Sequence, residues 1–393
     1  MTPNRCTSLL NTYREGLLND TVPFWIRTAV DRQHGGFITS LDRDGSVIDT
    51  DKGMWQQGRF TWLLAHLYNQ VEARPEWLEL ATHGIDFIRQ HGFDADGRMW
   101  FHLTREGAPL RKRRYAFTEA FTIMAFAEYA RATNDDRMAE NAIQLFERYQ
   151  AFRQQPTGPN KFEPTRPMKS MGGPMITLSI CQVLRAAIDW PQANRFIDQS
   201  IDEIEQDFVK PDREVVMESV GPEGQIYDHF DGRTLNPGHA IEGAWFIMHE
   251  GKHRADPQLI QLGTQMLEWM WHRGWDEEYG GMFYFRDLRG LPVQEYWQDM
   301  KFWWPHNETI IATLLAWSLT GQARYADWHR QIHDWAYQHF PDEVHGEWYG
   351  YLHRDGRISV PLKGNLWKGP FHLPRMQLYC WKLLEEKLSS EVT

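Results

Sequence analysis

The sequence predicts an all-α fold in which six helical hairpins close into a ring, and three observations lead to this prediction. Amphipathic helical stretches occur in consecutive pairs, with short Gly- and aromatic-rich segments between the pairs. These segments recur with a period near 65 residues, since 64 residues separate Gly36 from Trp100 and 67 separate Gly281 from Trp348. The period divides the 393-residue chain about six times, and no alternating βα pattern is present. We therefore expect an (α/α)6 barrel that forms one domain over residues 1–393.

Apolar residues at helical spacing define the predicted helices along the chain. In the first helix, Trp55, Trp62, Leu63 and Leu67 recur on one face. The predicted pairs are Met54–Asn69 with Trp77–Gln90, Phe117–Thr133 with Asp136–Gln150, Glu242–Glu250 with Pro257–Arg273, and Glu308–Thr320 with Ala323–His339. No Pro/Ser-rich linker separates these pairs into different domains.

Short β-hairpins are predicted between the helix pairs. Segments such as Gly280–Phe283 provide an aromatic strand, and polar turns that end in Gly give the signal for a tight hairpin. The predicted turns are Leu41–Gly45, Leu103–Gly107 and Leu352–Gly356, and Met217–Val220 falls near the place of a fourth copy. In such a ring the hairpins and the starts of the inner helices gather at one end, so we expect a deep pocket there.

Composition and charge argue against several classes of protein. With 42 basic and 53 acidic residues the net charge is −11, which argues against a nucleic-acid partner. No stretch of about 18 apolar residues is present, so we expect no membrane association through a spanning helix. The first twenty residues lack the apolar core of a signal peptide, and three widely spaced cysteines indicate a reduced, cytoplasmic protein. The 19 tryptophans suit the flat faces of sugar rings, although a large helical core would use them equally well.

Several common catalytic and binding motifs are missing from the sequence. It contains no phosphate-binding loop of the Gly-x-x-x-x-Gly-Lys-Ser/Thr type and no Gly-x-Gly-x-x-Gly after a strand. It also lacks His-Glu-x-x-His, Cys-x-x-Cys and Gly-x-Ser-x-Gly, so neither a zinc site nor an esterase nucleophile is indicated. We therefore expect no bound metal and no required cofactor.

Two segments place candidate catalytic groups at the starts of helices. In Asn236–Glu242, Pro and Gly break the chain before a helix, so His239 lies at a helix N-terminus that favours the neutral imidazole which a base requires. In Lys301–Glu308, Trp304 gives an aromatic wall beside the carboxylate of Glu308. Helix capping or simple packing stays open as the role of these residues.

A third segment, Lys363–Arg375, has two glycines and two prolines around His372, which is typical of a shaped loop that holds a side chain in place. Supporting polar candidates occur near other predicted helix starts. They are Arg59, Tyr115, Glu119, Glu218 and Arg233. Surface salt bridges are the alternative for each of them taken singly. Their recurrence at one end of successive hairpins favours a shared site.

Four segments of the chain and the motif Trp55–Arg59 resemble the N-acylglucosamine 2-epimerase superfamily. The four segments are Asn236–Glu242, Trp303–Glu308, Gly346–Leu352 and Lys368–Arg375. The resemblance runs from about residue 20 to residue 385. It implies an (α/α)6 barrel and a metal-independent reaction on the open-chain form of an aldose. The family includes N-acetylglucosamine 2-epimerases, cellobiose 2-epimerases and mannose–fructose isomerases.

The resemblance also implies roles for individual residues. His239 and His372 match the two catalytic histidines of the family. The positions implied to bind or polarise the sugar are Arg59, Glu218, Glu242, Glu308 and Arg375. Trp304 joins them as the candidate aromatic wall. Tyr115, Arg233 and Lys368 match the pattern of substrate-binding residues less closely. A homodimer and an activating nucleotide such as ATP are implied by the family alone.

One departure from the family pattern bears on the substrate. Isomerases and cellobiose epimerases carry an additional pocket histidine, and the corresponding segment Pro167–Ile176 has none. This segment is similar to the N-acylglucosamine branch. We therefore expect a 2-epimerase that interconverts N-acetylglucosamine and N-acetylmannosamine by removing and returning the proton at carbon 2 with two histidines. The alternative is a 2-epimerase or aldose–ketose isomerase for unsubstituted sugars such as mannose, glucose, fructose or cellobiose.

Two other classes of function stay open. A ring of helical hairpins also supports glycoside hydrolysis, which needs two carboxylates beside the scissile bond, and Asp is scarce in the three candidate segments. A non-catalytic sugar- or protein-binding ring is the second class, because mammalian relatives bind another protein. The presence of both His239 and His372 favours catalysis.

Overall fold

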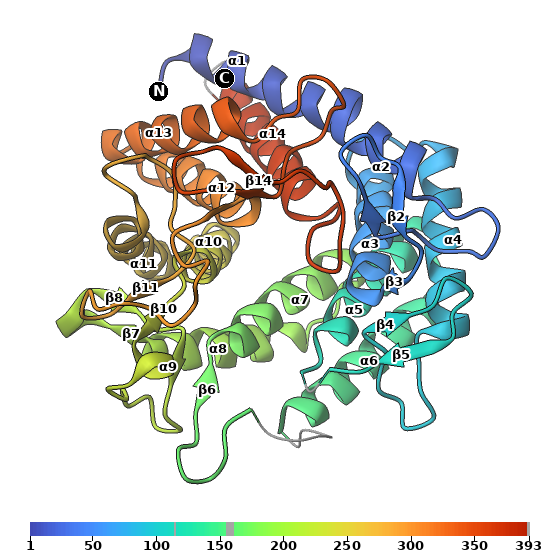
Figure 1. The fold of residues 1–393 in the computed structure, drawn as a ribbon, viewed down its shortest axis with the longest axis horizontal. Helices are drawn as coiled ribbons and strands as arrows, with labels where there is room; N and C mark the ends of the chain where they lie inside the picture. Colours follow the sequence, from blue (N-terminus) through green and yellow to red (C-terminus); the bar gives the residue numbers. More distant parts are fainter. Residues whose placement is uncertain (114, 155–160, 391–393) are drawn as a thin grey trace.

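Six inner helices line the axis of the molecule in the computed structural model, which describes residues 1–113, 115–154 and 161–390 (Figure 1). These helices are α3 (Met54–Gln70), α5 (Phe117–Thr133), α7 (Gly172–Ile188), α10 (Pro237–Arg254), α12 (Trp303–Thr320) and α14 (His372–Ser390). Consecutive inner helices pack against one another around the ring. They are buried on nearly every face, as in α12, where every residue from Trp303 to Trp317 is buried.

An outer layer of helices covers the inner ring. Five outer helices each follow their inner partner in the chain: α4 (Pro75–His91), α6 (Asp136–Gln154), α8 (Ala193–Glu203), α11 (Pro257–Gly274) and α13 (Ala323–His339). The sixth pair joins the two ends of the chain, because α1 (Pro3–Glu15) packs on α14. The short α2 (Val22–Ala29) follows a π-helical turn at Gly16–Thr21. This arrangement confirms the predicted (α/α)6 barrel.

The observed helices extend the predicted ones toward the pocket. Helix α10 begins at Pro237 and α12 at Trp303, so both start at least one turn earlier than the apolar pattern predicts. Proline is well tolerated in the first turn, because its missing N–H has no intrahelical partner there. As a result, the candidate residues of both segments lie within the first two turns of inner helices.

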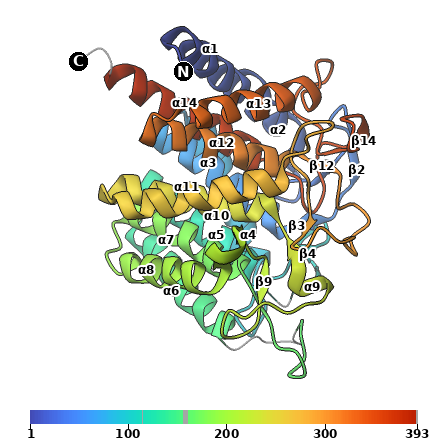
Figure 2. The same ribbon diagram turned by 90° about the vertical axis from the view of Figure 1, so that its left-hand side faces the viewer.

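The short strands lie at one end of the barrel (Figure 2). The predicted turns are confirmed by three antiparallel hairpins: β1 (Ser40–Leu41) with β2 (Val47–Asp49), β4 (His102–Leu103) with β5 (Pro109–Arg111), and β13 (Tyr351–Leu352) with β14 (Ile358–Val360). β3 (Lys52–Gly53) adds to β4, and β12 (Lys301–Phe302) adds to β13. The other antiparallel pairs are β6 (Lys169–Ser170) with β9 (Ser219–Val220), β7 (Val209–Lys210) with β8 (Val215–Val216), and β10 (Thr234–Leu235) with β11 (Arg286–Asp287).

The Gly- and aromatic-rich segments were predicted to form the first strands of the hairpins. In the structure they form tight loops that precede the hairpins. Each loop is closed by an isolated bridge, as between Pro341 and Trp348. The fourth copy is confirmed, since Met217 N donates to Phe208 O at 2.9 Å just as Tyr349 N donates to Phe340 O at 2.8 Å.

Among the described residues, three ion clusters, each containing a buried Asp–Lys pair, connect successive hairpins. In each cluster an Asp at the start of a tight loop forms two ion pairs. One partner is a buried Lys that precedes an inner helix, and the other is an Arg in the next hairpin turn along the ring. The clusters, called clasps below, are Asp31–Lys52–Arg105, Asp276–Lys301–Arg354 and Asp342–Lys363–Arg43. The third clasp closes the ring, because Arg43 belongs to the first hairpin and Asp342 follows α13.

Replacing Asp31 by Asn is expected to lower the free energy of unfolding by about 3–5 kcal/mol, because the Lys52 ammonium stays buried without its counter-charge. Burial alone would raise the pKa of Asp31, but hydrogen bonds from Arg105 and Lys52 hold that pKa well below its ordinary value. Urea denaturation measures the loss. The control Asp327→Asn removes an exposed partner of Arg330 and should cost less than about 0.5 kcal/mol. An equal loss for both variants would contradict the prediction.

No helix in the part of the chain that the structure describes has the length and apolar character needed to cross a membrane. The prediction of a single domain over residues 1–393 stays a prediction.

Candidate active site

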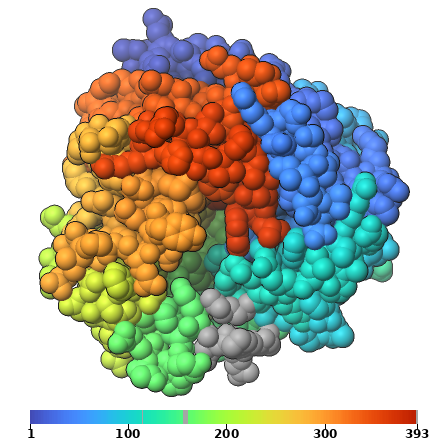
Figure 3. Space-filling view, viewed as in Figure 1, coloured from blue at the N-terminus to red at the C-terminus, as the bar shows by residue number. Residues whose placement is uncertain are grey.

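The hairpin end of the barrel is hollowed at its centre, where the starts of the inner helices meet (Figure 3). Three of these helices each carry two predicted site residues. His239 and Glu242 lie on α10, Trp304 and Glu308 on α12, and His372 and Arg375 on α14. Arg59 comes from α3, and Glu218 lies directly before β9. The structure therefore brings together residues that are more than 300 positions apart in the sequence.

His239 is held through its Nδ1 and its backbone N–H. Nδ1 donates to Glu218 Oε2 at 3.0 Å, and the N–H donates to Oδ1 of Asn236, the side chain that caps α10, at 3.2 Å. Burial alone would lower the pKa of His239, but the charge and hydrogen bond of Glu218, with the charges of Glu242 and Glu308, raise it above its ordinary value. This shift runs opposite to the one expected from the helix N-terminus, because the carboxylate of Glu218 is in contact with the imidazole.

His372 has the opposite electrostatic setting. Its Nδ1 lies 2.7 Å from Glu308, which also accepts hydrogen bonds from Arg375 at 2.7 Å and from Trp245 at 2.8 Å. Because both neighbours donate to Glu308, we assign its carboxylate as the acceptor for the Nδ1–H of His372. Burial raises the pKa of Glu308, and the guanidinium of Arg375 opposes this effect. Burial and the positive charges of Arg375 and Arg59 lower the pKa of His372 well below its ordinary value.

The two imidazoles share one aromatic neighbour. The ring centroid of Trp304 lies 5.0 Å from that of His239 and 5.7 Å from that of His372. Tyr284 packs edge-on against the same indole at 5.9 Å. In both histidines Nδ1 is engaged, whereas Nε2 has no hydrogen-bond partner among the described residues. Two Nε2 atoms are thus available to a substrate beside Trp304.

Two guanidinium groups differ in how they are held. Arg375 Nη2 donates to both Glu242 and Glu308, so this cation is neutralised. Arg59 is buried among three aromatic rings, donates only a 3.3 Å hydrogen bond to Trp367 O, and its Nε has no partner within the described chain. The rings are those of Trp55, Phe121 and Phe371. Burial and the neighbouring Arg375 lower the pKa of Arg59 to about 9, so it is still charged at neutral pH.

Three predicted residues lie outside this group of contacts. Tyr115 packs on Trp55, at 6.1 Å between ring centroids, on the α5 side of the pocket. Arg233 pairs with Asp228 and with the buried Asp287. Lys368 is fully buried, and its amine pairs with Glu347. For Arg233 and Lys368 the structure shows ion pairs that fix loops, in place of contacts with the other predicted residues.

Several residues of the pocket were missed by the sequence interpretation. Trp245 donates a hydrogen bond to Glu308, and Asn236 accepts one from the backbone N–H of His239. Trp367 lies at the mouth, 5.6 Å from Trp55 between ring centroids. Asn236 carries a recognisable signal, because it is an N-cap residue before Pro-Gly. Trp245 carries none, because a buried and a pocket-lining indole have the same helical spacing, and Trp367 lies in a loop that shows no periodicity.

The carboxylates of Glu242 and Glu308 and the imidazole of His372 place three ligand atoms within 4.8 Å of one another. Three such groups often hold a divalent cation. Here Arg375 donates to both carboxylates, so the positive charge that they require comes from the guanidinium. The prediction that the site needs no metal stays a prediction.

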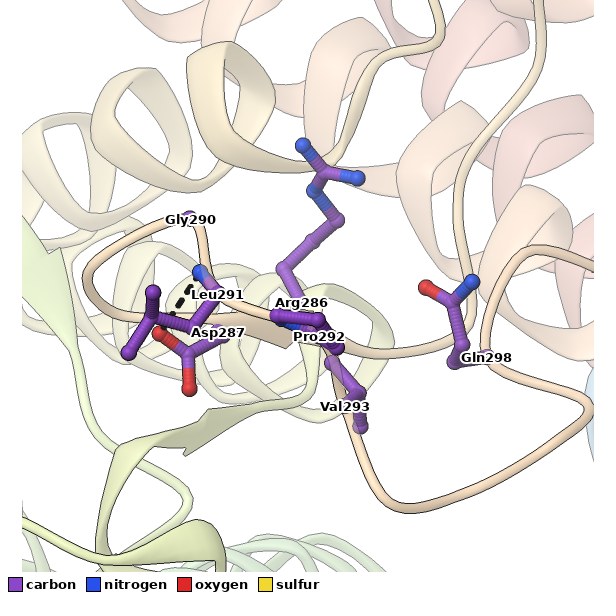
Figure 4. Close-up of a pocket in the computed structure, with 7 residues that line it drawn as sticks. All are labelled: Arg286, Asp287, Gly290, Leu291, Pro292, Val293 and Gln298. Carbon is purple, nitrogen blue, oxygen red and sulfur yellow. Dashed lines mark hydrogen bonds between the residues drawn. The ribbon is translucent and has the colours of Figure 1, made fainter.

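A second hollow lies at the rim, beside the 287–298 loop (Figure 4). The residues that line it are Arg286, Asp287, Gly290, Leu291, Pro292, Val293 and Gln298. The carboxylate of Asp287 is already engaged by Leu291 N at 3.2 Å and by Arg233 at 2.9 Å. This hollow contains none of the predicted catalytic residues, so the central pocket is the candidate active site.

Known proteins match the chain over nearly its full length. The model of the N-acylglucosamine 2-epimerase (GlcNAc 2-epimerase) family matches residues 36–372. An N-acylglucosamine 2-epimerase from Bos taurus is 36% identical, and the alignment covers 95% of this chain and 90% of that protein. A cellobiose 2-epimerase structure from Spirochaeta thermophila DSM 6192 superposes with a TM-score of 0.84 at 18% identity, covering 98% of each chain. A D-mannose isomerase structure superposes with a TM-score of 0.80 at 18% identity, covering 95% of this chain and 98% of the other.

Proposed function

This chain belongs to the N-acylglucosamine 2-epimerase family, and on that premise we propose that it interconverts N-acetylglucosamine and N-acetylmannosamine with His239 and His372 as the proton-transfer groups. One observation carries the proposed mechanism. Two histidines from the helices on either side of α12 contact the same indole, and each uses Nδ1 for a carboxylate so that Nε2 is left for the sugar.

The two histidines have complementary protonation states. At neutral pH the lowered pKa of His372 leaves it a neutral base, and the raised pKa of His239 favours its protonated form. In one direction His372 takes the proton from carbon 2, and the bonding electron pair moves into the carbonyl to form an enolate. His239 then delivers a proton to the opposite face of carbon 2, which inverts the centre. In the reverse direction the two residues exchange roles.

The proposed oxyanion group is Arg59. The aldehyde oxygen of the open-chain sugar gains negative charge as the proton leaves, and a fixed guanidinium in a pocket with little water stabilises that charge strongly. Arg59 forms no ion pair with the described residues, whereas Nη2 of Arg375 is engaged by two carboxylates, and the Nε of each guanidinium has no partner among those residues. Arg375 and Glu308 accordingly orient His372.

Proton NMR in deuterium oxide tests the proposed substrate directly. Incubation with N-acetylglucosamine should give N-acetylmannosamine that carries deuterium at carbon 2. Cellobiose and mannose are the matched substrates for the alternative, and the cellobiose 2-epimerase and D-mannose isomerase structures share the fold. Conversion of either unsubstituted sugar without turnover of N-acetylglucosamine would overturn the proposed substrate.

Replacing Glu218 by Gln is expected to shift the alkaline limb of the pH profile to lower pH. Without the carboxylate charge, burial dominates and the pKa of His239 falls, so the protonated acid is lost at lower pH. The limb of kcat/KM should move by about one to three pH units. The acid limb reports protonation of His372 and should stay in place. An alkaline limb that does not move would show that His239 is not the acid.

The cytoplasmic location, the homodimer, the absence of a required cofactor and an allosteric effect of ATP stay predictions.

A further inference from the structure

The three tight loops that begin the clasps differ in the residue that follows the clasp Asp by five positions. In each loop the fifth residue after the clasp Asp has left-handed backbone geometry, with φ of 63° at Gly36, 74° at Gly281 and 56° at Glu347. The Asp N–H donates to the carbonyl of this residue in all three loops, at 2.9–3.0 Å. Glycine adopts this geometry without strain, whereas a residue with a Cβ does so at a cost. The third loop therefore retains a strained Glu where its counterparts use Gly.

The same repeat carries an additional loop ahead of its inner helix. After Lys52, helix α3 begins at Met54, and after Lys301, helix α12 begins at Trp303. After Lys363, helix α14 begins only at His372. Residues 364–371, called the 364–371 loop below, thus separate the third clasp from its helix. This loop ends at one of the two proposed catalytic histidines.

The strained Glu and the additional loop are joined by a buried ion pair. Lys368 lies within the 364–371 loop, and its Nζ donates to the carboxylate of Glu347, with both side chains fully buried. Nζ also donates to Lys363 O at 3.1 Å, and the Glu347 N–H is held by Asp20 at 2.9 Å. The Glu347–Lys368 ion pair thus connects the middle of the 364–371 loop to the third clasp, which lies at the start of this loop.

The 364–371 loop reaches both sides of the pocket. The Trp367 carbonyl accepts from Arg59 Nη1 at 3.3 Å. On the other side, Lys368 Nζ lies 5.8 Å from the ring centroid of Trp303, which contacts His372 at 6.1 Å between centroids. A shift of this loop would therefore displace the proposed base and the proposed oxyanion group together.

We propose that Glu347 and Lys368 form a positioning pair that fixes the 364–371 loop, and with it the imidazole of His372 and the guanidinium of Arg59. The inference rests on the catalytic role proposed for His372. It explains why a strained, charged residue occupies a position where two equivalent loops use Gly, since unfavourable backbone geometry is retained where a site requires it. It also assigns Lys368 to the loop instead of to the sugar.

The double variant E347G/K368M tests the pair. Gly relieves the backbone strain, as Gly36 and Gly281 do in the equivalent loops, and removal of both charges leaves neither buried alone. We expect kcat to fall about 10²-fold, because small displacements of catalytic groups have effects of this size. KM should stay within about threefold, because the proposed role of both residues is to hold the loop and not the substrate. The urea midpoint should not decrease, because backbone strain is relieved and neither charge is left buried alone. As a matched control, R185M breaks a buried pair with Glu250 near the far end of α10 and should lower the midpoint without changing kcat.

A spectroscopic signature separates positioning from catalysis. The 2.7 Å hydrogen bond from His372 Nδ1 to Glu308 should give a downfield proton resonance, assigned by its absence in H372N. The resonance should be lost or shifted in E347G/K368M and unchanged in R185M. If H372N remains active, the proposed function fails, while this resonance still reports whether the pair positions the ring.

Three results would overturn the positioning role: an unchanged kcat in the double variant, an unchanged resonance, or a raised KM at constant kcat. The last result would assign Lys368 to substrate binding. Should the double variant not fold, Glu347→Gln retains a neutral acceptor for Lys368. A reduced kcat at constant KM in that variant supports the pair, and a wild-type kcat overturns it.

Discussion

Replacing either His239 or His372 by Asn should abolish net epimerisation, with kcat lower by about 10²–10⁴-fold, because inversion needs one proton-transfer group on each face of carbon 2. The fold should be retained. Asn keeps a polar group near the position of Nδ1, and neither imidazole belongs to the three clasps. The rate is measured by proton NMR with each of the two sugars as the starting material.

Hydrogen exchange at carbon 2 separates the roles of the two residues. A variant that lacks His239 retains the neutral base His372, which can still remove and return a proton on its own face. That variant should incorporate deuterium into one epimer without converting it, and the His372 variant should do so only with the other epimer. The two variants therefore act as controls for each other.

Exchange of both epimers by one single variant would contradict the two-base mechanism. Exchange of the same epimer by both variants would contradict it as well, since the two residues would then serve one face. A near-normal epimerisation rate would remove the replaced residue from the mechanism.

The ring of helical hairpins follows from the sequence because its elements repeat locally. The period between Gly36 and Trp100 and between Gly281 and Trp348 predicts the hairpins, and apolar spacing predicts the paired helices. The pair of α1 and α14 could not be predicted in this way, because its members lie at opposite ends of the chain. The α1–α14 pair forms only when the ring closes, and a short stretch of sequence contains no information about that closure.

The candidate site was predictable in its residue types and less so in its electrostatics. His239, Glu308 and His372 lie in segments whose Pro and Gly residues mark helix starts. The pKa of His239 depends on Glu218, which lies 21 positions earlier, and the helix N-terminus alone suggests the opposite shift. Lys368 is indistinguishable in sequence from a substrate-binding lysine, because its partner Glu347 belongs to another loop.

Replacing Arg59 by Met should lower kcat by about 10²–10³-fold, which is the effect of removing one group from an oxyanion site. The stability should not fall. Arg59 lies among the rings of Trp55, Phe121 and Phe371 and forms no ion pair with the described residues, so its charge is desolvated without a paired carboxylate. Met fills similar volume without that desolvation cost, and the urea midpoint should stay the same or rise.

Arg375→Met is the matched control for the role of Arg59, because it removes a neighbouring guanidinium that is bound to two carboxylates. It leaves Glu242 and Glu308 buried without their counter-charge, so the free energy of unfolding should fall by about 3–5 kcal/mol. Loss of activity with retained stability in the Arg59 variant, and loss of both in the Arg375 variant, would separate the group that meets the substrate from the group that holds His372. If the Arg59 variant keeps a normal kcat, the developing charge must be stabilised elsewhere. Arg375 would then be the candidate, because its Nη2 is engaged by Glu242 and Glu308 while its Nε has no partner among the described residues.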